Sequence, residues 1–196
     1  MAGERAARTA QTRARIKRAL IELMGEKGFD ALTVSDVTRR ARINRGTFYL
    51  HFSNIYQLLE SIEEELLEGT AACVESCVAS LAQDHSKLRC LAALADVIRF
   101  YEQNRRYLVL LLGPKGDAGF IVRLKDRLKP LWREYVVPSS ADRSEAEIDL
   151  ILEYTLSGSL FMISRWLQEP GGVSAATLGH LIYDAAIRDV STRISS

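Results

Sequence analysis

Residues Asn44 to Phe52 read NRGTFYLHF, and this stretch decides the fold. Phe48 and Phe52 are four residues apart, so they share one face of a helix and indicate a buried apolar side. Arg45 and Tyr49 belong to the other side, where they offer hydrogen-bond donors. We therefore predict a short helix that packs into a core on one face and binds a polar partner on the other.

The residues before this stretch predict two more helices. Apolar residues recur at helical spacing from about residue 9 to residue 27, and Gly28 supplies a left-handed helix end. Thr33 and Asp36 have the spacing of a capping box, which begins a short second helix. Asn44 can then cap the third helix. Two short helices supported by a longer one predict a helix-turn-helix.

The polar side of the third helix suits DNA. Hydroxyl groups donate to phosphate oxygens, and an arginine can also reach guanine edges in the major groove. We therefore expect double-stranded DNA as a partner. The residues expected to contact it are Thr33, Ser35, Arg42, Asn44, Arg45, Gly46, Thr47, Tyr49 and His51.

Composition and charge agree with a helical protein that has a basic N-terminal region. The 196 residues include only four prolines, which favours an all-α fold. Residues 1–55 hold eleven Lys and Arg against five Asp and Glu, a net charge of +6, whereas residues 56–196 have a net charge of −5. This asymmetry favours a polyanionic partner for the first part, although a solvated charged helix would explain it equally well.

Several classes of protein are not expected. There is no apolar run of the roughly 18 residues that a membrane span needs, and the basic start lacks a secretory signal, so we expect a cytoplasmic protein with no membrane partner. No catalytic constellation stands out, so no enzyme is predicted. Cys73, Cys77 and Cys90 allow a metal or redox sensor, but buried cysteines acting as small hydrophobes are the favoured interpretation. We expect no metal and no cofactor.

Residues Thr12 to Leu59 resemble the DNA-binding head of the TetR (tetracycline-repressor) family of bacterial regulators. The resemblance rests on the amphipathic first helix, GFDALTVSDV, INRGTFYLHF and the pair Leu58-Leu59, about a quarter of the chain. Two positions depart from the family pattern: Arg42 replaces a turn glycine, and Ile55 replaces a lysine that commonly contacts phosphate. Arg42 can compensate for that lost cation.

The resemblance implies two domains. Residues 1–55 would form the helix-turn-helix domain, with residues 1–12 as a flexible basic arm, and residues 56–196 a helical body that dimerises and binds an effector. The last two helices would pair with those of a second copy, although packing inside one monomer would also explain their apolar residues. The expected dimer residues are Leu150, Tyr154, Gly158, Phe161, Leu178, Ile182, Ala185 and Ala186.

The same resemblance implies a ligand site in the body. Aromatic residues are the candidates, although aromatics at helical spacing are more often plain core. The expected effector residues are Phe100, Tyr107, Phe120, Trp132, Tyr135 and Tyr154. The predicted function is a dimeric, sequence-specific transcriptional regulator, a repressor released by an unknown small molecule. The alternative is a helix-turn-helix regulator controlled by a partner protein.

Overall fold

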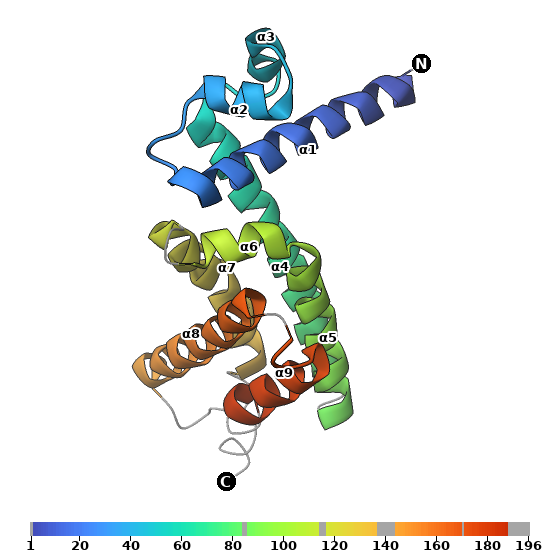
Figure 1. Cartoon of the computed structure of the whole chain (residues 1–196). Helices are drawn as coiled ribbons and strands as arrows, with labels where there is room; N and C mark the ends of the chain where they lie inside the picture. The colour runs from blue at the N-terminus through green and yellow to red at the C-terminus, as the bar shows by residue number, and fades with distance from the viewer. Residues whose placement is uncertain (1, 84–85, 114–116, 137–143, 170, 188–196) are drawn as a thin grey trace. The chain divides into compact units, whose positions relative to one another are not determined.

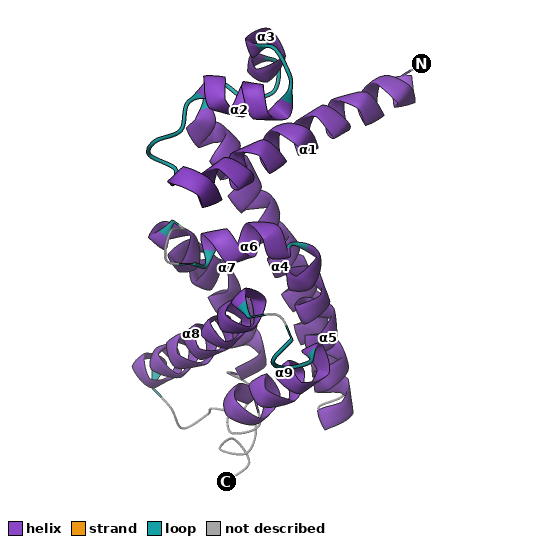
Figure 2. Ribbon diagram, in the orientation of Figure 1, coloured by secondary structure: helices purple, strands orange, loops and turns teal. Residues whose placement is uncertain are grey.

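The computed structural model describes residues 2–83, 86–113, 117–136, 144–169 and 171–187. Helices connected by loops make up this part of the chain, and it contains no strand (Figure 2). None of the described helices is long and apolar enough to cross a lipid bilayer. The all-α prediction is confirmed. Figure 1 labels the helices: α1 (Ala2–Lys27), α2 (Val34–Ala41), α3 (Arg45–Tyr49), α4 (Ile55–Gln83), α5 (Lys87–Gln103), α6 (Arg105–Leu111), α7 (Ala118–Val136), α8 (Glu145–Gln168) and α9 (Ala175–Ile182), the last followed by a π-helical turn (Tyr183–Ile187).

The chain divides into two compact units, residues 1–66 and 67–196, which we call the head and the body. The division falls within α4, after Leu66, whereas the sequence suggested a boundary between residues 55 and 56. The first turns of α4 count with the head because Leu58 and Ile62 are buried there.

The head has a small apolar core. α1 packs on α2, and α2 packs on α3 (Figure 1). Ile16, Leu20, Val37, Phe48 and Leu58 are fully buried, with no exposed side-chain surface. Phe52 is also buried, so the predicted apolar face of the opening stretch is confirmed.

The segment expected to form a flexible basic arm is helical over the described residues 2–12, because α1 begins at Ala2. Most of these residues are strong helix formers, whereas Gly3, Thr9 and Thr12 are weak ones. The hydroxyls of Thr9 and Thr12 donate to the carbonyls of Arg5 and Arg8 at 2.9 Å in both cases, which adds hydrogen bonds along the helix.

The body consists of the rest of α4 and helices α5 to α9. α7 packs on α8, and α5 packs on α9. Buried side chains from several helices form its core, among them Ile98, Tyr101, Leu108, Phe120 and Leu152. The predicted helix from residue 174 to residue 194 is observed as α9 and the π-helical turn, and residues 188–194 lie outside the described residues.

A ladder of ion pairs joins α7 to α8. Lys129 on α7 lies 2.6 Å from Asp149 and 3.8 Å from Glu153. On either side of it, Lys125 pairs with Glu153 and Arg133 pairs with Glu145. Hydrogen bonding to Asp149 raises the pKa of Lys129, and hydrogen bonding to Lys125 lowers the pKa of Glu153.

Candidate nucleic-acid interface and internal cavity

The start of α2 is fixed by the predicted capping box. The Thr33 hydroxyl accepts from the Asp36 amide at 3.3 Å, and the Asp36 carboxylate accepts from the Thr33 amide at 3.1 Å. Lys27 at the end of α1 lies 3.2 Å from the same carboxylate. The hydrogen bond from Thr33, followed by that from Lys27, lowers the pKa of Asp36. One carboxylate thus caps α2 and ties it to α1.

The turn between α2 and α3 has a left-handed residue. Arg42 has φ 52° and ψ 51°, a conformation that favours glycine and costs an arginine roughly 1 kcal/mol. A second arginine, Arg15 on α1, stabilises the turn: its guanidinium donates to the carbonyls of Ala41 at 2.5 Å and Arg42 at 3.2 Å. Sequence reasoning missed this role of Arg15, because only the fold brings residues 26 positions apart into contact.

Asn44 caps α3 as the sequence predicted. Its Oδ1 accepts from the Thr47 amide at 2.7 Å and from the Thr47 hydroxyl at 2.9 Å. Phe48 then points into the head core, and its ring packs edge-on against Tyr49 with centroids 5.6 Å apart. α3 is therefore held from one side by its cap and from the other by a buried ring.

The opposite face of this short helix is open. Arg42, Arg45 and Gly46 are exposed, and Tyr49 has an exposed fraction of 56%. The Arg45 guanidinium donates to the Ser35 hydroxyl on α2, which brings two of the expected contact residues together. His51, half-buried, lies beside Phe52 at the end of the same segment.

Some other cations of the head are paired with carboxylates. Arg40 donates to both carboxylate oxygens of Glu26, at 2.9 and 2.7 Å, and the nearly buried Lys17 lies 2.5 Å from Glu65. Among the described residues, by contrast, Arg42 and Arg45 form no ion pair. The structure thus separates cations that stabilise the head from cations that remain available to an anionic partner.

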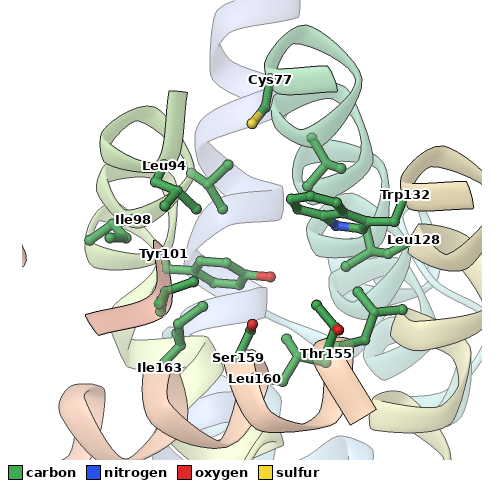
Figure 3. Close-up of a pocket in the computed structure, with 14 residues that line it drawn as sticks. Cys77, Leu94, Ile98, Tyr101, Leu128, Trp132, Thr155, Ser159, Leu160 and Ile163 are labelled. Atoms are coloured by element: carbon green, nitrogen blue, oxygen red, sulfur yellow. The ribbon is translucent and has the colours of Figure 1, made fainter. Parts of the chain in front are cut away.

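The body encloses an apolar cavity of about 50 Å³. Side chains of α4, α5, α7, α8 and α9 form its wall (Figure 3). Three hydroxyl-bearing residues, Tyr101, Thr155 and Ser159, are the polar exceptions in a lining of aliphatic side chains, Trp132 and Cys77.

Comparison with known proteins identifies the head. Residues 16–62 match the model of the bacterial regulatory proteins of the tetR family. This match shows a tetR-type DNA-binding region over these residues, about a quarter of the chain. An uncharacterised helix-turn-helix transcriptional regulator of Bacillus subtilis (strain 168), YvdT, is 43% identical over 56 residues, which is 29% of each chain. The chain covers 29% and 43% of the length of the first two curated relatives that it matches.

Solved structures of TetR-type regulators share the fold of the whole chain. A TetR transcriptional regulator from Streptococcus agalactiae 2603V has a TM-score of 0.64 at 21% identity, with 96% of this chain and 100% of that one covered. FadR from Bacillus subtilis, in complex with stearoyl-CoA, has a TM-score of 0.63 at 14% identity, with 89% and 97% covered. At these identities the likeness shows the fold. The predicted all-helical fold with an N-terminal helix-turn-helix head is thereby confirmed.

The cavity of the body is lined by one of the six expected effector residues, Trp132. Phe120 is buried in the core but is not among the residues that line the cavity. Tyr154 is 75% exposed and is not among them either. Phe100 packs against Gly69, and Tyr107 is half-buried away from the cavity lining. The Tyr135 side chain lies outside the described residues. Sequence reasoning missed Tyr101, Thr155 and Ser159. In the sequence they are ordinary helix residues, and only the fold brings them to one cavity.

The expected dimer residues separate into two groups. Leu150, Tyr154 and Phe161 are 69%, 75% and 69% exposed, and Gly158 lies on the same face of α8 with open space around it. The assignment of Leu178 and Ile182 to the dimer interface was wrong, because both side chains are 3% exposed and lie in the body core. Ala185 is exposed, and the Ala186 side chain lies outside the described residues.

The cysteine environment favours unreactive thiols. Cys77 and Cys90 are buried, and Cys73 is half-buried. Burial, followed by the proximity of Cys90 and Asp96, raises the pKa of Cys77 to about 12. Burial also raises the pKa of Cys73. Because the thiolate is the form that binds metals and attacks oxidants, a raised pKa opposes both kinds of sensing.

Proposed function

We propose that this TetR-family transcriptional regulator is a dimeric repressor that a small molecule releases from its operator. The observation that carries the proposal is the open face of α3 beside Arg42 and Arg45, which form no ion pair with any residue that the structure describes. In this arrangement α3 of each subunit enters the major groove, and the dimer reads two half-sites of a near-palindromic operator.

Different side chains of the head are suited to contact the phosphate backbone and to recognise bases. Arg45 is long, exposed and on the first turn of α3, so it is the side chain suited to guanine edges. Tyr49 and Thr47 offer hydroxyls to phosphate, and Arg42 adds a cation at the turn. Asn44 serves chiefly as a cap, because its Oδ1 is already occupied by two donors from Thr47.

The exposed face of α8 is the proposed dimer surface. Leu150, Tyr154, Gly158 and Phe161 recur at helical spacing and form an apolar stripe. Leu181 on α9, 48% exposed, is a further candidate. Large apolar side chains gathered on one helix face mark an interaction surface rather than a solvated one.

An effector site in the body is supported by the cavity and by relatives of the same fold. FadR of Bacillus subtilis is described in complex with stearoyl-CoA. An apolar cavity with hydroxyl groups on its wall favours a small ligand over control by a partner protein. A ligand that binds more tightly to a body conformation in which the heads do not fit the operator would weaken DNA binding.

The experiment begins with selection of a DNA site from random sequence by the purified full chain. Binding to the selected site and to scrambled DNA is then measured across a salt series. We expect tight, salt-dependent binding to the selected site and at least ~1000-fold weaker binding to scrambled DNA. Equal affinity for both would refute sequence-specific regulation.

Sedimentation tests the dimer. The native chain should sediment as a dimer at micromolar concentration, and Tyr154→Glu should sediment as a monomer. Val122→Glu is the matched control, because Val122 is 53% exposed but lies on α7. A native monomer, or equal effects of the two substitutions, would contradict the proposed surface.

A further inference from the structure

We propose that the effector cavity binds an electrically neutral, mostly apolar molecule with one hydroxyl or carbonyl group. The inference rests on the proposed function, because it takes the body cavity as the effector site. It adds the chemical class of the ligand, which follows from the residues of the cavity wall.

The wall contains no charged side chain among the described residues. A carboxylate or phosphate buried there would lose its hydration without meeting a counter-charge, which costs several kcal/mol even after relaxation. A neutral apolar molecule pays no such penalty. The lining residues are Val74, Cys77, Leu94, Val97, Ile98, Tyr101, Leu128, Trp132, Thr155, Leu156, Ser159, Leu160, Ile163 and Ile182.

The polar groups on the wall suit a single neutral hydrogen-bonding group. The hydroxyls of Tyr101 and Ser159 point into the cavity from α5 and α8, and Thr155 lies one helical turn from Ser159 (Figure 3). A phenol donates one hydrogen bond and accepts others, so Tyr101 can pair with an alcohol or a carbonyl. All three hydroxyl-bearing residues line this one small cavity, so they favour one polar group on the ligand over several spread along it.

Tyr101 remains a donor over the physiological pH range. Its side chain is 1% exposed, and burial raises the pKa of its phenol, an effect that the neighbouring Thr70 hydroxyl opposes. Its hydroxyl therefore stays protonated. This buried donor is the group that would fix the orientation of the ligand.

The cavity also limits the size of the ligand. Its volume of about 50 Å³ holds water but is well below the ~300–1000 Å³ of sites for drug-sized ligands. A compact ligand must therefore displace a wall side chain. Trp132 is the large wall residue that is only half-buried, so its ring can move at the least packing cost and should report binding by fluorescence.

The test compares three six-carbon probes that share an alkyl chain: hexan-1-ol, hexanoate and hexanoyl-CoA. The protein is the full chain with Trp166→Phe, which leaves Trp132 as the remaining tryptophan of the two. We expect hexan-1-ol to change Trp132 fluorescence with a Kd at least roughly tenfold lower than that of hexanoate at pH 7.5. Hexanoyl-CoA should bind no better than hexanoate.

A second variant tests the orienting hydroxyl. Tyr101→Phe keeps the ring, so it should weaken hexan-1-ol binding by about 2- to 12-fold, the equivalent of one neutral hydrogen bond. Tyr107→Phe, which removes a hydroxyl outside the cavity, should leave the Kd unchanged. Ser159→Ala offers the same test if Tyr101→Phe fails to fold.

The outcomes separate the ligand class from the proposed function. Tighter binding of hexanoate or hexanoyl-CoA than of hexan-1-ol would overturn the neutral-ligand assignment and leave the proposed function standing. No fluorescence change with any probe would also overturn it. If hexan-1-ol binds as expected but leaves operator affinity unchanged, the ligand class is supported and the effector part of the proposed function fails.

Discussion

The head and the body position their functional groups in different ways. In the head, the side chains proposed to touch DNA are exposed, and a separate set of residues holds α3 in place: Phe48 below it, the Asn44 cap before it and the Arg15 guanidinium at the turn. In the body, residues that line the cavity, such as Tyr101 and Leu160, are themselves buried core. Function and stability should therefore be separable by mutation in the head but coupled in the body.

The largest expected effect is that of Tyr101→Ala. Removing a wholly buried aromatic side chain should lower the free energy of unfolding by about 3–5 kcal/mol, in addition to any loss of ligand binding. Tyr49→Ala, on the exposed face of α3, should change it by less than about 0.5 kcal/mol. Urea unfolding of both variants measures the difference. Similar losses of unfolding free energy for the two variants would contradict the proposed difference between head and body.

A second prediction concerns the thiol in the cavity wall. With a pKa of about 12, Cys77 should be alkylated by iodoacetamide at pH 8 on the order of 1000-fold more slowly than an ordinary exposed thiol. Its raised pKa also adds stability that is fully present below pH 9 and is lost as the pH rises toward 12.

The control for the thiol is the same reaction in urea, where Cys77 should react at the rate of an ordinary cysteine. Fast alkylation of Cys77 in the folded protein would show that the wall opens readily. The sensing interpretation of the cysteines would then return.

The third prediction tests whether the head separates function from stability. Arg45→Ala should weaken binding to the selected operator by about 1–3 kcal/mol per half-site and relax the preference at one base position. Its free energy of unfolding should stay within about 0.5 kcal/mol of the native value. Tyr49→Phe should weaken binding to all sequences alike. Equal losses on selected and scrambled DNA for Arg45→Ala would show that this arginine contacts the backbone.

The smallest expected effect is at the left-handed turn. Arg42→Gly should raise the free energy of unfolding by roughly 1 kcal/mol, because glycine adopts φ 52° without strain. It should also lower the salt dependence of DNA binding by about one phosphate contact per subunit. Arg42→Ala is the matched control, since it removes the same cation but keeps the strain. Identical stabilities for the two variants would show that the turn is not strained.

The sequence predicted the head well because its decisive interactions are local. The Thr33–Asp36 capping box, the Asn44–Thr47 cap and the Phe48–Phe52 face all lie within three or four residues, so periodicity and spacing reveal them. The Arg15 contact to the turn is not local, and it was missed.

The body was predicted only as a set of helices. Its cavity depends on which faces of five helices meet, and spacing within one helix does not determine that. Leu178 and Tyr154 illustrate the difficulty, because both are apolar residues on the last two helices, yet one is buried and the other exposed.

The ion-pair ladder between α7 and α8 has a consequence for how these helices are aligned. Its cations and its anions both recur every four residues, so sliding α8 by one turn would exchange partners and keep two of the three pairs. Lys129 already contacts both Asp149 and Glu153. Electrostatics therefore discriminates only weakly between the two registers. The apolar contact of Trp132 with Ile148 and Leu152 selects one alignment. Since Trp132 also forms part of the cavity wall, a molecule that moves this ring acts directly on the contact that sets the register.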